Sequence, residues 1–275
     1  MGEREGESES NNNNDNNNGK GSGLEFVLVH GSSHGGWCWY KIRTLLETSG
    51  HKVTCLDLKA SGIDSSDPNT ILTFDHYNQP LTNFMASLPP NQKVVLVGHS
   101  AGGLSLTDAI HKYGEKIHVA VYVAANMLKY GFSTDQDRKD GEPDLSEYGD
   151  VSELIYGLGP DQTPTSVIIK PQFQSMLMYN TSPIEDSTLA KMVVRPAPLR
   201  AFQDATFVEG PCSDSVRRVY IKTLQDRVIK QEQQDAMIRR WPPSQIFLSD
   251  TDHSPAFSNP RGLVRLLLQA ANGVN

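Results

Sequence analysis

The chain has 275 residues, of which 37% are hydrophobic, and this is enough for one sizeable core or two small ones. Lysine and arginine total 25 against 32 aspartates and glutamates, so the net charge is -7 and the surface has no general attraction for nucleic-acid phosphates or anionic lipids. The three cysteines are too few and too scattered for a disulfide framework. We therefore expect a cytoplasmic protein with neither a nucleic acid nor a membrane as its partner.

The first 23 residues differ in composition from the rest of the chain. Glutamate and serine alternate, a run rich in asparagine follows, and glycines and serine come next, with almost no apolar side chain among them. Such a composition cannot bury enough apolar surface to offset its ordering entropy. We predict a disordered tail over residues 1–23 and a single domain over residues 24–275.

From residue 24 onward, short apolar runs alternate with segments of helical spacing. The runs lack strict alternation of apolar and polar residues, which is typical of strands buried on both faces of a parallel sheet. This order predicts an α/β fold with a mainly parallel sheet and helices on both of its faces. The expected strands are 25–30, 53–58, 93–97, 117–123, 217–222 and 244–249, and the expected helices of the first three units are 37–49, 76–88 and 102–113.

About 90 residues separate the fourth expected strand from the fifth, far more than the few residues of a usual connection in such folds. Residues 126–212 contain proline-punctuated pieces and apolar clusters at 154–156 and 176–179. These features predict a mostly helical cap over the carboxyl ends of the strands, where open α/β sheets bind their ligands.

A serine in the pattern G-x-S-x-G lies directly after the third expected strand. The motif is GHSAG at residues 98–102, so Ser100 falls on a sharp turn between a strand and a helix, as a nucleophile elbow requires. A second match, GSSHG at 31–35, centres on Ser33 but lies in a longer loop. We favour Ser100 as the nucleophile and expect the loop after the first strand to supply a backbone N–H to an oxyanion.

A serine nucleophile needs a histidine base, and eight histidines compete for that role. His253 lies in the loop after the last expected strand, at the sheet edge where Ser100 also lies, so we favour it. His99 is next to the serine in sequence and is expected to point elsewhere. The others begin strands, belong to helices or lie in the first loop: His30, His34, His51, His76, His111 and His118.

The chain order serine, acid, histidine asks for a carboxylate at a strand end between the two. Asp226 follows the strand at 217–222 and meets this condition, although it could instead cap the helix that comes next. Asp250 and Asp252 are rivals, but they lie so close to His253 in sequence that reaching its ring is harder. No glycine-rich phosphate loop and no histidine or cysteine spacing typical of a metal site is found, so we expect no cofactor and no metal.

Several stretches make the chain resemble the plant methylesterase and hydroxynitrile lyase family of α/β-hydrolases, from about residue 24 to the C-terminus. They are FVLVHG at 26–31, GGWCWYK at 35–41, Asp57-Leu58 with Ser61-Gly62, GHSAGG at 98–103 and Asp252-His253. Further stretches are similar to the branch that hydrolyses methyl indole-3-acetate. These are NQPL at 78–81, GLGP at 157–160, RPAP at 195–198 and MIRRWPP at 237–243.

The resemblance implies an α/β-hydrolase fold with a catalytic triad and an oxyanion hole. The family's nucleophile, acid and base fall on Ser100, Asp226 and His253, and its two oxyanion N–H groups fall on Ser32 and Ala101.

The resemblance also implies a serine esterase that demethylates a small plant-hormone ester, methyl indole-3-acetate first, with methyl jasmonate and methyl salicylate as alternatives. The lyases carry threonine at Gly31 and lysine at Ser254, so a hydroxynitrile lyase is the less favoured reading. A hormone receptor that keeps the hydrolase pocket only for binding is a third hypothesis. The partner expected is a small-molecule methyl ester, and a homodimer is considered for the assembly.

Overall fold

The computed structural model describes residue 2 and residues 23–273, so almost all of the predicted tail lies outside the described residues. Six strands form one parallel sheet in the order β2-β1-β3-β4-β7-β8. This architecture confirms the predicted α/β fold. The strands are β1 (Glu25–Val29), β2 (Lys52–Leu56), β3 (Val94–His99), β4 (Ile117–Val123), β7 (Arg218–Thr223) and β8 (Gln245–Ser249).

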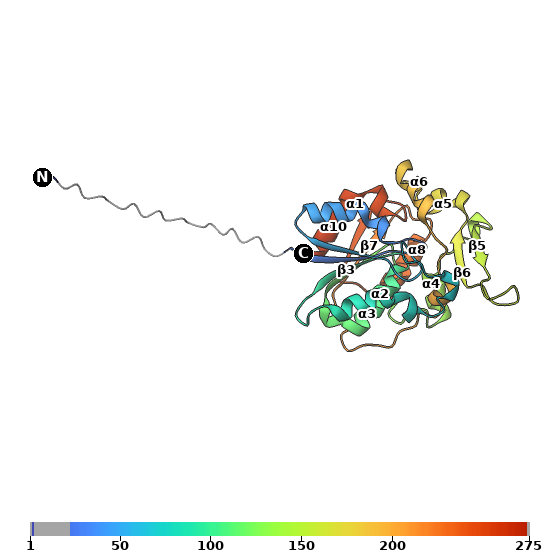
Figure 1. The fold of residues 1–275 in the computed structure, drawn as a ribbon, viewed down its shortest axis with the longest axis horizontal. Coiled ribbons are helices and arrows are strands. Elements are labelled where there is room, and N and C mark those ends of the chain that lie inside the picture. Colours follow the sequence, from blue (N-terminus) through green and yellow to red (C-terminus); the bar gives the residue numbers. More distant parts are fainter. Residues whose placement is uncertain (1, 3–22, 274–275) are drawn as a thin grey trace.

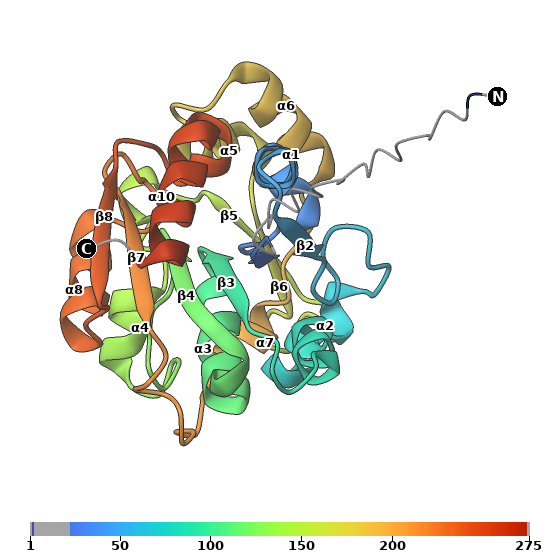
Figure 2. The same cartoon turned by 90° about the vertical axis from the view of Figure 1, so that its left-hand side faces the viewer.

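Helices cover both faces of this sheet (Figure 1). Helices α1 (Tyr40–Thr48) and α10 (Pro260–Asn272) lie together on one face, and α2 (Phe74–Ser87) and α3 (Gly102–Tyr113) lie on the other. Figure 2 shows the same two layers with the strands between them. The remaining elements of this part are α8 (Gln231–Arg240), α9 (Pro255–Ser258) and the 3-10 helices η1 (Gly36–Trp39), η2 (Pro68–Thr70) and η3 (Gly114–Lys116).

The position of each strand in the sheet explains its pattern of apolar and polar residues. Every residue of the inner strands β1 and β3 is buried, which is why both read as continuous apolar runs. The edge strand β8 alternates instead, and Ile246 and Leu248 on it are exposed. The core of the molecule therefore lies on the two faces of the inner strands.

The register of the sheet brings distant loops to one edge. Val29 pairs with Gly98, His99 with Val123, Val123 with Ile221, and Thr223 with Ser249, so these strands end at nearly the same level. The loops that follow β1, β3, β4, β7 and β8 consequently meet at the carboxyl edge.

The segment between β4 and β7 forms the cap region. In addition to helices, it contains a two-stranded antiparallel sheet that the sequence pattern did not indicate, and residues 154–155 belong to it. Figure 1 shows these elements at one end of the molecule. They are α4 (Asp135–Gly141), η4 (Ser146–Tyr148), β5 (Ser152–Ile155), β6 (Ser166–Ile169), α5 (Pro171–Met178), α6 (Ile184–Val193) and α7 (Leu199–Gln203).

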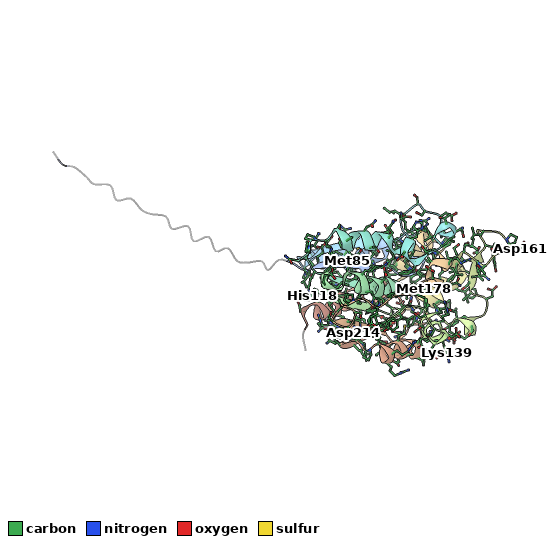
Figure 3. The ribbon with its side chains drawn as sticks, turned by 90° about the horizontal axis from the view of Figure 1, so that it is seen from below. Met85, His118, Lys139, Asp161, Met178 and Asp214 are labelled. Atoms are coloured by element: carbon green, nitrogen blue, oxygen red, sulfur yellow. The ribbon has the colours of Figure 1, made fainter. Side chains whose placement is uncertain are left out.

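Polar contacts attach the cap region to the sheet part. The carboxylate of Asp186 on α6 is buried and accepts hydrogen bonds from the Tyr40 hydroxyl, at 2.7 Å, and from the Lys41 ammonium. Figure 3 shows Asp161, in the connection between β5 and β6, at one end of the molecule, whereas Met178 at the end of α5 lies nearer the middle of the view. Met178 and Leu177 are buried, so this end of α5 packs inside the protein.

Candidate active site

Ser100 lies on a sharp turn between β3 and α3. Its backbone φ is +53°, a left-handed conformation that non-glycine residues rarely adopt. The turn closes tightly because a Cβ on Gly98 would lie 2.5 Å from Leu106 Cδ1, and one on Gly102 would lie 2.6 Å from the His30 carbonyl oxygen. The two glycines of the motif therefore leave the space that lets Ser100 stand at the carboxyl edge.

The structure brings Ser100, His253 and Asp226 together in one hydrogen-bonded chain. The Ser100 Oγ lies 3.0 Å from His253 Nε2, and the His253 Nδ1 lies 2.9 Å from Asp226 Oδ2. All three residues are buried. This is the geometry in which an imidazole takes a proton from a serine while a carboxylate holds its tautomer.

Asp226 both caps a turn and contacts the His253 ring, which are the two roles that its sequence position allows. Its Oδ1 accepts the backbone N–H groups of Val228, at 2.8 Å, and Ile229, at 2.9 Å, as a turn-capping aspartate would. Its Oδ2 accepts the Thr223 hydroxyl at 2.8 Å in addition to contacting the His253 ring. The two oxygens separate the two roles, so capping holds the carboxylate in place for the histidine.

The rival carboxylates are engaged elsewhere. Asp250 is exposed, and the side-chain amide of Gln225 donates to it. Asp252 is fully buried, but its carboxylate bonds to Thr181 and Ser182 of the cap region and to its own loop rather than to the His253 ring.

Two backbone N–H groups lie close to Ser100. Ala101 follows Ser100 directly, and Ser32 follows Gly31, where a Cβ would lie only 2.8 Å from the Ser100 Cβ. The loop after β1 therefore passes beside Ser100. Within residues 23–273, neither the Ser32 nor the Ala101 N–H donates to a protein acceptor, so both could donate to an oxygen atom held there.

Ser33, the rival serine, lacks these neighbours. It also has a positive φ, of +66°, and lies at the cavity wall, but among the described residues no histidine contacts its hydroxyl. Its carbonyl oxygen accepts the Arg195 N–H at 3.0 Å. Ser33 thus joins the loop after β1 to the cap region through a backbone hydrogen bond.

Two more histidines belong to the site, and sequence reasoning did not find their contacts. The His99 Nε2 donates to the His253 carbonyl oxygen at 2.6 Å. The His34 Nδ1 donates to the Ser32 carbonyl oxygen at 2.8 Å, and its Nε2 accepts the Tyr179 hydroxyl at 2.8 Å. The local sequence signal for these contacts was only that His99 directly precedes Ser100. The contacts of His99 and Tyr179 join distant parts of the chain, so no short sequence pattern predicts them.

Burial keeps these two rings neutral. It lowers the pKa of His34 to about 4 and lowers the pKa of His99 well below its ordinary value. Each ring can then donate through one nitrogen only, to the carbonyl that it faces. The uncharged His99 and His34 rings therefore hold the backbone of His253 and of Ser32 in place through hydrogen bonds to their carbonyl oxygens.

A cavity of about 310 Å³ opens in front of Ser100, between the sheet edge and the cap region. Among the described residues, Glu142 is the one aspartate, glutamate, lysine or arginine on its wall, and it is exposed. The wall is mostly apolar, and its members include Leu104, Phe132, Leu145, Val167, Met178, Leu199 and Val228. Such a lining suits a neutral, largely apolar ligand.

In residue 2 and residues 23–273, no three histidine, cysteine, aspartate or glutamate side chains gather where they could share a metal ion. No helix of these residues has the length and apolar character needed to cross a membrane.

Comparisons with known proteins show the family to which the chain belongs. The family model described as "Alpha/beta hydrolase family" matches residues 26–266. Methylesterase 17 of Arabidopsis thaliana is 57% identical over 253 residues, which cover 90% of this chain and 92% of that protein. The chain belongs to the plant methylesterases of the α/β-hydrolase family. It is therefore an enzyme that acts on ester bonds.

Other relatives and solved structures resemble this methylesterase over nearly its whole length. The pFDCC methylesterase of Arabidopsis thaliana is 44% identical, with 90% of this chain and 95% of that protein covered. A crystal structure of the Arabidopsis methylesterase MES16 has a TM-score of 0.82 at 43% identity, with 91% of this chain and 100% of that chain covered. A variant of tomato methylketone synthase I, solved in complex with beta-ketoheptanoate, has a TM-score of 0.85 at 37% identity, with 91% of this chain and 98% of that chain covered.

Proposed function

We propose that this methylesterase demethylates a small plant-hormone ester, methyl indole-3-acetate first, with methyl jasmonate and methyl salicylate as alternatives. The observation that carries the proposal is the hydrogen-bonded chain of Ser100, His253 and Asp226, which opens into a small and nearly uncharged cavity. Methylesterase 17, at 57% identity, supports the ester class of the substrate without naming the acid.

In the proposed mechanism, His253 takes the proton of the Ser100 hydroxyl as its oxygen attacks the ester carbonyl carbon. The carbonyl oxygen becomes negative and accepts the N–H groups of Ser32 and Ala101. The C–O bond to the methoxy group then breaks, and the His253 imidazolium gives its proton to the departing methoxide, which leaves as methanol. A water molecule releases the acid from Ser100 by the same steps in reverse order.

The cavity favours a small acyl group. Its volume of about 310 Å³ lies at the lower end of the range of about 300–1,000 Å³ for small-molecule sites. Among the described residues, no lysine or arginine lines it, so nothing there would hold the carboxylate product by charge. This lining suits an enzyme whose substrate is a neutral ester and whose acid product must leave the cavity.

Two other functions compete with hydrolysis. A hydroxynitrile lyase of this family would carry a threonine at position 31 and a lysine at 254, and here glycine and serine stand there. A Cβ at Gly31 would meet the Ser100 Cβ at 2.8 Å, so this backbone has no room for the threonine side chain. A binding-only receptor does not require the serine-histidine-aspartate chain to be aligned for proton transfer, which favours the esterase.

A panel of methyl esters tests the proposal. The esters of indole-3-acetate, jasmonate and salicylate and a chlorophyll-derived carboxymethyl ester are incubated with the enzyme, and release of acid and methanol is measured. We expect the highest kcat/KM with methyl indole-3-acetate and complete dependence on Ser100. Release of cyanide from a cyanohydrin without ester hydrolysis would favour the lyase. Tight binding of a hormone without turnover would favour the receptor.

We also propose a cytoplasmic location and a homodimeric assembly, although some relatives are named chloroplastic. The three cysteines are free thiols, which suits a reducing compartment. Microscopy of a fluorescent fusion and light scattering of the purified enzyme test the two statements.

A further inference from the structure

Ser32 carries one of the two proposed oxyanion donors, and it lies between two peptide groups that are each held by an imidazole. The Gly31 carbonyl oxygen belongs to the same peptide group as the Ser32 N–H, and the His30 Nδ1 donates to it at 2.7 Å. The Ser32 carbonyl oxygen belongs to the next peptide group, and the His34 Nδ1 donates to it at 2.8 Å. A carbonyl oxygen only accepts, so in both rings the Nδ1 carries a hydrogen.

The second nitrogen of each ring accepts from a different part of the molecule. Burial lowers the pKa of both histidines, so the rings are neutral and their Nε2 atoms only accept. The His30 Nε2 accepts the backbone N–H of Leu58, in the loop after β2, at 3.1 Å. The His34 Nε2 accepts the hydroxyl of Tyr179, which directly follows α5 in the cap region, at 2.8 Å. The orientation of the His34 ring therefore depends on the cap region.

The loop after β1 needs this support because its backbone is strained. Ser33 has a φ of +66°, a left-handed conformation that a non-glycine residue keeps only where surrounding contacts hold it. These contacts include the Arg195 N–H, which donates to the Ser33 carbonyl oxygen at 3.0 Å, and the bond from the His34 ring to the Ser32 carbonyl oxygen. Loss of the bond from His34 would let the peptide group between Ser32 and Ser33 turn, and the Ser32 N–H would move with it.

The cap segment that contains Tyr179 also contacts the cavity and the other catalytic loop. Met178, the residue before it, lines the cavity. The N–H of Thr181 donates to the buried carboxylate of Asp252, in the loop of the catalytic histidine. Tyr179 has only 3% of its surface exposed, so its hydroxyl is paired with the His34 ring rather than with solvent. One short segment of the cap thus joins the substrate cavity to both loops that act on the ester.

We propose that Tyr179 is a positioning residue that acts through the His34 ring to hold the Ser32 N–H where the ester carbonyl oxygen becomes negative. The inference rests on the proposed esterase mechanism, in which that oxygen accepts the N–H groups of Ser32 and Ala101. A displaced donor stabilises the transition state less, whereas the apolar wall still binds the acyl group. The loss should therefore fall on kcat and leave KM almost unchanged.

The first experiment compares two variants that each lose one hydroxyl of the cap region. On the methyl ester that the enzyme hydrolyses best, Tyr179→Phe should lower kcat by at least about tenfold and change KM by less than about twofold. Tyr156→Phe is the matched control, because Tyr156 is exposed and does not line the cavity, and it should keep both constants. A kcat of Tyr179→Phe within about twofold of the unaltered enzyme would overturn the inference and leave ester hydrolysis intact.

The second experiment separates positioning from a general disturbance of the cavity. In a trifluoromethyl ketone with the same acyl group, the Ser100 oxygen bonds to the carbonyl carbon, the serine proton passes to His253 and the carbonyl oxygen becomes negative. Its Ki should rise at least about tenfold in Tyr179→Phe. The matched ether, in which a CH₂ group replaces the carbonyl group, forms no such oxygen and should keep its Ki. Equal weakening of both inhibitors would contradict the positioning role.

The third experiment tests whether Tyr179 acts through His34. In the background of His34→Leu, which removes both hydrogen bonds of the ring, Tyr179→Phe should lower kcat by less than about twofold. A further tenfold loss would show that Tyr179 acts by another route and would overturn the inference. If His34→Leu no longer binds the ether, the two inhibitors in Tyr179→Phe decide alone. If the unaltered enzyme neither hydrolyses a methyl ester nor is inhibited by the ketone, the proposed function itself has failed.

Discussion

At the scale of single residues, Ser100 shows how strain is kept at a reactive position. A left-handed non-glycine residue costs on the order of 1–3 kcal/mol and persists only where its surroundings hold it. Here the Ser100 N–H donates to the Val123 carbonyl oxygen at 3.2 Å, and the Ser100 carbonyl oxygen accepts the N–H groups of Gly103 and Asn126. Hydrogen bonds with the end of β4, the segment after it and the first turn of α3 therefore fix the conformation that places the hydroxyl at the cavity wall beside His253.

The two serine motifs lead to opposite expectations for their alanine variants. Ser100→Ala should lose nearly all ester hydrolysis, because it removes the only described hydroxyl in contact with the His253 ring. Ser33→Ala should stay within about tenfold, since it alters one loop contact. Steady-state rates on methyl indole-3-acetate, with labelling by a serine-directed organophosphate, measure both. An inactive Ser33→Ala variant together with an active Ser100→Ala variant would reverse the assignment of the nucleophile.

Asp226→Asn should inactivate the enzyme without unfolding it. The amide oxygen of the new side chain can still accept the N–H groups of Val228 and Ile229, which turns its NH₂ group toward the His253 Nδ1. That nitrogen must then accept, so the Nε2 carries the proton and cannot take the one on Ser100. We expect kcat to fall by about 10⁴ with little change in Tm. Activity close to that of the unaltered enzyme would place the acid elsewhere.

At the scale of elements, Asp252 joins the loop after β8 to the cap region. One carboxylate oxygen accepts the Thr181 N–H at 2.9 Å and the Ser182 hydroxyl at 2.8 Å. The other accepts the Ser254 N–H at 2.9 Å and the Ser258 hydroxyl at 2.8 Å. A single buried carboxylate thus ties the loop that carries His253 to the cap region on one side and to helix α9 on the other.

Asp252→Asn should therefore weaken both stability and turnover. An amide has one acceptor oxygen, so its NH₂ group must face donors on one side and leave them unpaired. We expect the free energy of unfolding to fall by about 1–3 kcal/mol, and kcat to fall as the His253 loop loosens. Urea unfolding and steady-state kinetics measure the two effects. Asp250→Asn, at an exposed position two residues earlier, is the control and should change stability by less than about 0.5 kcal/mol.

At the scale of the whole molecule, buried neutral histidines link folding to pH. Burial lowers the pKa of His30, His34 and His99 in the folded protein, and for His34 to about 4. An unfolded chain has ordinary histidines with a pKa near 6.5. Between these values, the unfolded state binds protons that the folded state does not. The free energy of unfolding therefore falls as the pH drops from about 6.5 to about 4, and the contribution is complete above about 6.5.

The His34→Gln variant tests this linkage. In the unaltered enzyme, His34 alone should account for a loss on the order of 2 kcal/mol between pH 7 and pH 5. The variant should lose less stability over that interval, because one titrating group is gone. Urea unfolding at the two pH values measures the difference. His76→Gln, which removes an exposed histidine on α2, is the control, and an equal loss in both variants would contradict the assignment to His34.

Local sequence patterns were sufficient for the main elements of this methylesterase. The six strands and the elbow at Ser100 follow from apolar runs, turn residues and the spacing of glycines, since each depends on sterics and burial within a few residues. The end of a strand also predicts where a side chain will lie, because parallel strands in one sheet finish at a common edge. For that reason chain order pointed to Ser100 and His253 as site residues, with Asp226 as the favoured one of three candidate acids.

Tertiary structure decided what depends on partners far away in the chain. It separated Asp226 from Asp250 and Asp252, because only packing determines which carboxylate meets an imidazole. It also formed β5 and β6 from a segment with weak local patterning, and it oriented the His34 ring by placing the Ser32 carbonyl oxygen and the Tyr179 hydroxyl on either side of it. A short sequence window encodes backbone conformation, but the direction of a polar side chain is settled by whichever buried groups the fold places around it.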